Sequence, residues 1–259
     1  MKRHILLTGA TGGLGGGAAL GLAPDHHVTA AGETWSQVRD FREKAGGKLD
    51  VIKLDLRDEI DLDHAADRRV DVLVLNAGIQ ESGSILDIPM ERVRASFDVN
   101  VFGHLELVKR VLPQMLKRRR GRVVWMSSLA GILSPPFLGT YAATKHAIEA
   151  IAAAMRVELV GRGISVATIN PGFYRTGFND TGAETSRQWA SREKEQVTMP
   201  PMGPLLKVAQ HDPQPMIDEM VRVIPDRKSR YRTMMPEDAV AEAKKAQELG
   251  WTADSIGLP

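Results

Sequence analysis

The chain has 259 residues, of which 43% are apolar and 25% are charged, and its formal net charge is +2. Length and composition predict a single globular domain spanning residues 1–259, and the balanced charge argues against a nucleic-acid partner. Cysteine is absent, which excludes disulfides, thiolate metal sites and cysteine nucleophiles, and suits a cytoplasmic protein. We expect no metal site.

Two long runs without charge, residues 5–24 and 123–144, raise the question of an export or membrane-spanning segment. The first contains seven glycines, which make a poor apolar helix. The second holds serines, prolines and a tyrosine, which fit a strand, a loop and the start of a helix better. We therefore expect no membrane association.

The first two thirds of the chain alternates short apolar runs with helical stretches, which is the pattern of β-α-β units on a parallel sheet. The runs are rich in Val, Ile and Leu with little alternation, as expected for strands covered on both faces. The predicted fold class is therefore α/β, a single doubly wound parallel sheet of about seven strands with helices on both faces. The predicted strands are His4–Thr8, His27–Ala31, Asp50–Leu54, Val70–Leu75, Arg122–Ser127, Ile164–Ile169 and Ser229–Met234.

Six helical stretches accompany these strands, and Pro113 should kink or divide the third of them. Residues 173–212 are rich in proline, glycine and scattered large apolar residues, which predicts a helical lid over a substrate site and not another strand–helix unit. The predicted helices are Leu14–Leu22, Trp35–Lys44, Glu91–Lys117, Thr140–Gly161, Pro215–Val223 and Pro236–Leu249.

A glycine-rich turn, Thr8-Gly9-Ala-Thr-Gly-Gly13-Leu14-Gly15, follows the first strand and opens the first helix. Glycines permit a tight turn and close backbone approach, and a helix N-terminus presents free N–H groups to an anion such as a dinucleotide phosphate. The spacing differs from the Gly-x-Gly-x-x-Gly pattern. A turn that needs glycine only for its conformation is the alternative.

Residues at the ends of the second and third strands bear on the choice of cofactor. Glu33 follows the second strand, where a carboxylate can accept hydrogen bonds from ribose hydroxyls and repel a 2′-phosphate. No Arg or Lys is adjacent in that loop or within the glycine motif, so the sequence favours NAD(H) over NADP(H). A solvated glutamate is the alternative. Asp55, followed by Leu56, could face an adenine or cap a turn.

Two further sequences follow strands. Asn76-Ala77-Gly78 after the fourth strand could shape the floor of a cofactor cleft or serve as an ordinary turn. Tyr141 and Lys145 lie four residues apart in a helical run, so they share a helix face. An ammonium group beside a phenol favours the phenolate, which predicts a lowered Tyr141 pKa and a proton donor and acceptor usable near neutral pH. Ser128 precedes the tyrosine and could donate a hydroxyl to the same site.

Together these signals resemble the short-chain dehydrogenase/reductase family over residues 1 to about 176, closer to its steroid and retinol dehydrogenase branch. The resemblance implies a Rossmann-type fold and an NAD(P)-dependent alcohol dehydrogenase or ketone reductase. The matching elements are Thr8-Gly9-x-x-x-Gly13-x-Gly15, Asp55, Asn76-Ala77-Gly78, Asn100, Ser128, Tyr141-x-x-x-Lys145, Pro171-Gly172 and Thr176.

The resemblance also implies roles. Tyr141 would be the general acid in reduction and the base in oxidation, and Lys145 would bind the nicotinamide ribose and lower the Tyr141 pKa. Ser128 would hold the substrate oxygen, and Asn100 would anchor a water on a proton path. The implied cofactor-binding residues are Thr8, Gly9, Gly13, Leu14, Gly15, Glu33, Asp55, Leu56, Asn76, Ala77, Gly78, Tyr141, Lys145, Pro171, Gly172 and Thr176.

The expected substrate is a small hydrophobic ketone or secondary alcohol, because few polar residues stand near the expected pocket. The apolar candidates could also form an ordinary core beneath the lid, and three arginines leave room for a substrate acid group. We expect a homo-oligomer, a dimer or a tetramer. A cofactor-binding regulatory protein, or a lyase or epimerase of the same fold, is the alternative function. The candidate lid residues are Phe173, Tyr174, Phe178, Trp189, Met199, Met202, Arg175, Arg187 and Arg192.

Overall fold

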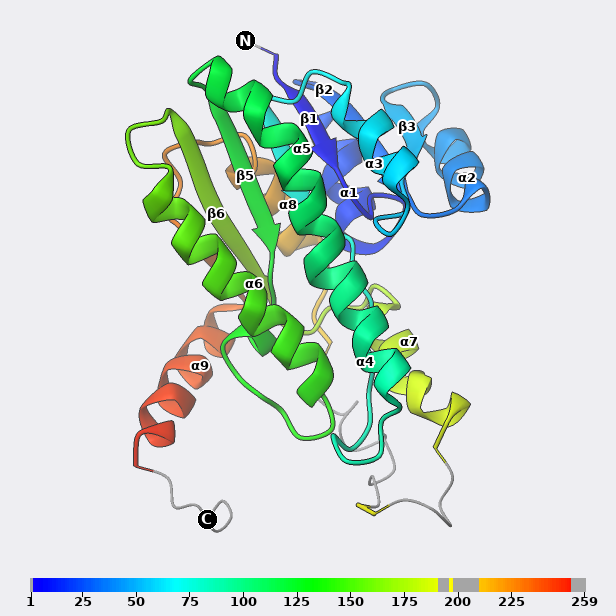
Figure 1. The fold of residues 1–259 in the computed structure, drawn as a ribbon, viewed down its shortest axis with the longest axis vertical. Coiled ribbons are helices and arrows are strands. Elements are labelled where there is room, and N and C mark those ends of the chain that lie inside the picture. Colours follow the sequence, from blue (N-terminus) through cyan, green and yellow to red (C-terminus); the bar gives the residue numbers. More distant parts are fainter. Residues whose placement is uncertain (1, 191–195, 198–209, 253–259) are drawn as a thin grey trace.

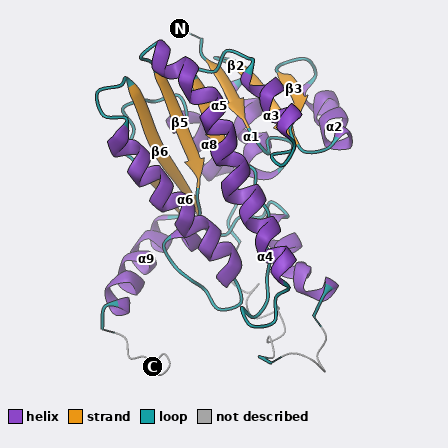
Figure 2. Cartoon of the chain, in the orientation of Figure 1, coloured by secondary structure: helices purple, strands orange, loops and turns teal. Residues whose placement is uncertain are grey.

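A seven-stranded parallel sheet forms the centre of the protein in the computed structural model, which describes residues 2–190, 196–197 and 210–252 (Figures 1 and 2). The strand order is β3-β2-β1-β4-β5-β6-β7, and the longest register pairs Gly121–Met126 with residues 164–169. The strands are β1 His4–Leu7, β2 His27–Gly32, β3 Asp50–Lys53, β4 Val72–Leu75, β5 Gly121–Met126, β6 Ile164–Pro171 and β7 Arg232–Met235. All seven predicted strands are confirmed, with ends that differ by up to three residues.

Helices cover both faces of the sheet, so the predicted doubly wound α/β fold is confirmed (Figure 1). One face packs against α1, α2 and α8 through an apolar core that includes Phe41 and Met220. The other packs against α3, α5 and α6 around the fully buried Trp125. The α-helices are α1 Gly13–Leu22, α2 Trp35–Ala45, α3 Glu59–Ala66, α4 Met90–Phe97, α5 Gly103–Lys117, α6 Gly139–Glu158, α7 Phe178–Glu184, α8 Gln214–Val223 and α9 Glu237–Gly250.

The third predicted helix is interrupted at a different place from the one expected. Pro113 lies inside the continuous helix α5, and the break falls at Asp98–Phe102, a π-helical turn between α4 and α5. Helix α3 was not predicted. It begins at a good N-cap, since Asp58 accepts the backbone N–H groups of Ile60 and Asp61. Its eight residues carry almost no amphipathic pattern to recognise.

The strand order places the site. The chain runs outward from β1 to β3 and then returns to add β4 on the other side of β1, so the order reverses between β1 and β4. The turns that leave the carboxyl ends of these two strands diverge there and open a crevice, where open α/β sheets bind ligands. The glycine turn follows β1 and Asn76-Ala77-Gly78 follows β4, so both border this crevice.

Candidate functional site

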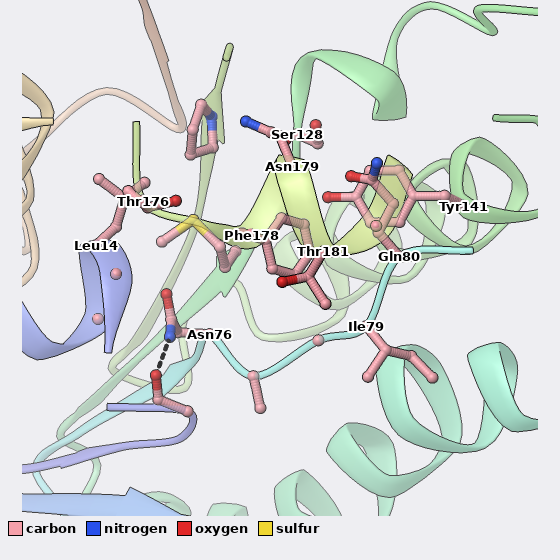
Figure 3. Close-up of a pocket in the computed structure, with 18 of the residues that line it drawn as sticks. Leu14, Asn76, Ile79, Gln80, Ser128, Tyr141, Thr176, Phe178, Asn179 and Thr181 are labelled. Atoms are coloured by element: carbon pink, nitrogen blue, oxygen red, sulfur yellow. Dashed lines mark hydrogen bonds between the residues drawn. The ribbon is translucent and has the colours of Figure 1, made fainter. Parts of the chain in front are cut away.

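A cavity of about 710 Å³ runs along the carboxyl ends of the strands, from the glycine turn to helix α6. It is lined by every residue that the sequence analysis assigned to the catalytic or cofactor-binding site except Thr8 and Asn100, which lie behind its wall. Figure 3 shows Leu14 and Asn76 on the left of the view, Tyr141 on the right and Ser128 above the middle, with Phe178 of α7 at the centre. The fold therefore joins residues from widely separated parts of the chain in one cavity.

At Gly9 and Gly15 the glycine turn is packed too closely against its neighbours to hold a side chain. Gly9 has φ of +60°, and a Cβ atom built on it would lie 2.6 Å from the Ala77 Cα atom. A Cβ on Gly15 would lie 2.4 Å from Asn76 Nδ2 and 2.6 Å from the Gly9 carbonyl oxygen. Helix α1 begins here without a side-chain cap, so its first N–H groups can bind an anion. These features fit a dinucleotide diphosphate.

Asn76 ties the end of β4 to this turn. Its amide Nδ2 donates to the carbonyl oxygens of Thr8 and Gly9, each at 2.9 Å (Figure 3). The two turns on either side of the crevice are therefore held together by hydrogen bonds as well as by the sheet. This supports the interpretation of Asn76-Ala77-Gly78 as the floor of the cleft.

A buried chain of hydrogen bonds connects Thr8 with Asn100. His104 Nδ1 faces the carbonyl oxygen of Asn100 at 3.0 Å, so this nitrogen carries the ring proton and Nε2 accepts from the Thr8 hydroxyl at 3.1 Å. Thr8 Oγ1 also accepts the backbone N–H groups of Asn76 and Ala77. Burial lowers the pKa of His104 to about 3, which keeps the ring neutral. His104 is thus a structural link and is not poised for acid–base chemistry.

Asn100 lies in the middle of the π-helical turn, which points its fully buried side chain inward. Its amide donates to the carbonyl oxygen of Ile79 at 2.9 Å and to Thr144 Oγ1 at 3.0 Å, and Oδ1 accepts the Ile79 N–H at 2.8 Å. The side chain therefore braces the loop after β4 against the turn before Lys145. The bound water implied by the family resemblance stays a prediction.

A guanidinium group that the sequence analysis missed lies at the far end of the cavity from Tyr141. Arg57, in the loop after β3, contacts Glu33 at 2.9 Å and Asp55 at 3.0 Å. Burial raises the pKa of Asp55, but hydrogen bonds and charge from Arg57 outweigh it, so this pKa lies below its usual value. No Arg or Lys is adjacent to Glu33 in the sequence, and Arg57 comes near it only because the loop after β3 folds back towards the end of β2.

Ser128, Tyr141 and Lys145 meet at the α6 end of the cavity. Ser128 caps a short 3-10 turn, where its hydroxyl accepts the Ala130 N–H at 3.1 Å. The Lys145 Nζ atom lies 5.5 Å from the centre of the Tyr141 ring and donates to the Met126 carbonyl oxygen at 2.9 Å. Both side chains are buried and line the same cavity, so they share one helix face as predicted.

The electrostatics of this group differ from the expectation. Burial raises the pKa of Tyr141 to about 12, against the opposing effect of a hydrogen bond with Ser128. Burial also lowers the pKa of Lys145 to about 8, although Glu149 raises it. For the protein alone, the predicted lowering of the Tyr141 pKa was therefore wrong, since desolvation outweighs the hydrogen bond with Ser128. The protein holds Tyr141 as a phenol, which is the form that donates a proton.

The substrate end of the cavity is less apolar than the sequence suggested. Gln80, Asn179 and Thr181 line it beside Phe178, whose ring centre lies 6.1 Å from that of Tyr141 (Figure 3). Gln80 follows Asn76-Ala77-Gly78 closely, so its place after β4 was the available signal. Of the other candidate lid residues, two also line the cavity, Phe173 and Tyr174. Three do not line it, namely Trp189, Arg175 and Arg187. The remaining three lie outside the described residues, namely Met199, Met202 and Arg192.

Within residues 2–190, 196–197 and 210–252, no helix is both long and apolar enough to cross a bilayer. Within the same ranges, no group of three or more histidine and acidic side chains is placed to hold a metal ion.

Residues 3–187, more than half of the chain, match the model of the short chain dehydrogenase family. The chain belongs to the short-chain dehydrogenase family. The family predicted from the sequence is thus confirmed, and the match extends from β1 to the 3-10 turn Thr185–Gln188 that follows α7.

One relative and two solved structures show how far the similarity to this family extends. Dehydrogenase/reductase SDR family member 7B of Xenopus laevis is 35% identical over 191 residues. The aligned region is 68% of this chain and 59% of the Xenopus protein, so it spans less than two thirds of that protein's length. A short-chain dehydrogenase structure from Streptomyces avermitilis has a TM-score of 0.81 at 26% identity, covering 97% of this chain and 94% of that one. A Beutenbergia cavernae protein with NADP bound at low occupancy has a TM-score of 0.76 at 26% identity, covering 92% and 97%.

Proposed function

We propose that this protein is an NAD(P)-dependent oxidoreductase that interconverts a hydrophobic ketone and its secondary alcohol. The observation that carries the proposal is the meeting of Ser128, Tyr141 and Lys145 in the same cavity as the uncapped glycine turn. The similar Beutenbergia cavernae protein, which holds NADP, supports a nicotinamide dinucleotide as the cofactor.

The chain's own residues divide the work. The glycine turn and the first N–H groups of α1 would hold the diphosphate, and Lys145 would bind the ribose next to the nicotinamide. Tyr141 gives a proton to the substrate oxygen in reduction and takes one in oxidation, while the Ser128 hydroxyl hydrogen-bonds to the same oxygen. The bound nicotinamide supplies or accepts the hydride.

The substrate proposed is a mostly apolar carbonyl compound with one further polar group. Phe173, Phe178 and Leu129 supply apolar lining, whereas Gln80 and Asn179 provide side-chain amides near the reacting end. A spectrophotometric screen of hydrophobic ketones with NADH and with NADPH tests the function. We expect cofactor oxidation with at least one ketone, and unchanged cofactor absorbance across the panel from folded protein would refute the proposal.

We propose NAD(H) as the preferred cofactor, because Glu33, Asp55 and Arg57 together carry one net negative charge where a 2′-phosphate would lie. Glu33→Ala should shift the NADPH-to-NADH ratio of kcat/KM upward by about tenfold, and Arg57→Ala should shift it downward. Steady-state kinetics with both cofactors measure these ratios. Glu43→Ala, on the exposed side of α2, should leave the ratio unchanged. A wild-type enzyme that prefers NADPH would contradict the assignment.

We also propose a homodimer formed through α4, α5 and α6. Large apolar side chains are exposed on this side of the fold, including Phe102 at 54% and Val157 at 64%. Such side chains are typical of subunit interfaces when they lie on neighbouring helices. Light scattering should give twice the mass of the chain, and a monomer at micromolar concentration would contradict the expectation.

A further inference from the structure

A buried carboxylate that takes no part in the proposed chemistry lies one helical turn after Lys145. Glu149 is only 8% exposed, and both of its carboxylate oxygens are bonded. Asn170 Nδ2 donates to Oε1 at 2.6 Å, and the Arg232 guanidinium pairs with Oε2 at 2.6 Å. A buried carboxylate is costly unless it is paired in this way, so the partners of Glu149 bear on what the carboxylate does.

The same carboxylate is joined to the segment that carries Ser128. Asn170 Nδ2 also donates to the Ser128 carbonyl oxygen at 3.1 Å, so one amide connects this segment to Glu149. Gly131, in the same 3-10 turn, packs against Glu149, since a Cβ built on it would lie 3.2 Å from the Glu149 Cγ atom. Glu149 therefore lies directly behind the loop that presents the Ser128 hydroxyl.

Arg232 reaches this cluster from a distant part of the chain. It begins β7, which pairs with β6 at the edge of the sheet and lies outside the residues 3–187 matched by the family model. Two other titratable groups lie around the cluster: the guanidinium groups of Arg232 and Arg156 both lie over the ring of Tyr231. The titratable groups next to Lys145 are Tyr141 on α6 and the neutral His104 on α5.

We propose that Glu149 and Arg232 are positioning residues of the active site: Glu149 keeps Lys145 charged, and Glu149 and Arg232 together hold the Ser128 segment in place. The inference deepens the proposed function and depends on it. Two physical effects separate it from an ordinary structural ion pair. The carboxylate stabilises the Lys145 ammonium, in agreement with its upward effect on the Lys145 pKa. Arg232 offsets part of that negative charge, so removing the two groups should have opposite electrostatic consequences.

The pH dependence of kcat/KM for ketone reduction tests whether Glu149 and Arg232 have these opposite effects on Lys145. Reduction should decline on the alkaline side, where Lys145, with a pKa of about 8, loses its proton. Glu149→Gln removes the stabilising charge and should move this decline about one unit towards lower pH. Arg232→Gln should move it about half a unit towards higher pH.

A matched control and a second variant keep the test decisive. Glu219→Gln removes an equally short ion pair, 2.6 Å to Arg222 on α8, and should leave the profile unchanged. Shifts of Glu149→Gln and Arg232→Gln in the same direction, or an unmoved profile, would overturn the inference. If Glu149→Gln does not fold, Arg232→Gln decides alone: an upward shift supports the inference, and no shift or a downward shift refutes it. A wild-type protein without turnover would refute the proposed function first and this inference with it.

Discussion

Tyr141→Phe should lower kcat for ketone reduction by about 10²–10⁴-fold, because it removes the hydroxyl that gives the proton to the substrate oxygen. The ring of Tyr141 is buried beside Phe178, so a phenylalanine fits the same space and the fold should be kept. Since the proton transfer occurs only in the transition state, kcat and kcat/KM should fall by similar factors. Initial rates followed by cofactor absorbance measure both constants.

The protein contains a matched control for this substitution. Tyr231→Phe removes a phenol at the edge of the sheet, next to the Arg156 guanidinium and outside the cavity lining. Its kcat should stay within about twofold of the wild type, as is usual for substitutions remote from a reacting group. Near wild-type turnover of Tyr141→Phe would show that another group supplies the proton.

Gly9→Ala should reduce the free energy of unfolding by about 2–5 kcal/mol and abolish saturable binding of the reduced cofactor. Alanine at φ of +60° costs about 1–2 kcal/mol, and overpacking against a neighbouring backbone costs about 1–3 kcal/mol. The neighbour here is the Ala77 Cα atom, 2.6 Å from the built Cβ, which cannot move without shifting the turn after β4. Urea unfolding and fluorescence titration with NADH measure the two effects.

Gly46→Ala separates the two causes. Gly46 has a similar φ of +56° at the end of α2, but nothing lies within 4 Å of a Cβ built there. The free energy of unfolding of Gly46→Ala should fall only by the cost of holding alanine at a positive φ, about 1–2 kcal/mol, and the variant should bind cofactor normally. Equal losses in the two alanine variants would show that Gly9 is required for its backbone angle alone and not for close approach.

Much of this architecture could be predicted from local sequence. Buried parallel strands are continuous apolar runs such as Val72–Leu75. The pairing of Tyr141 with Lys145 follows from helix geometry alone. The position of the glycine turn follows from its place between a strand and a helix. These features need no knowledge of tertiary contacts.

The missed features of the site depend on tertiary contacts. The π-helical turn at Asp98–Phe102 is stabilised by Asn100 bonding to Ile79, and no periodicity in the sequence marks it. Arg57 reaches Glu33 only because the loop after β3 folds back over the end of β2. The Tyr141 pKa was predicted from one neighbour, whereas the extent of burial decides it.

The most direct test of the account follows the hydride itself. A hydrophobic ketone is reduced with NADH or NADPH that carries deuterium on one face of the nicotinamide ring, each face in turn, and the alcohol is analysed by mass spectrometry. The account predicts one deuterium on the carbinol carbon with one of the two labelled faces. An alcohol without deuterium from either face, or a product formed with no net oxidation of cofactor, would contradict it.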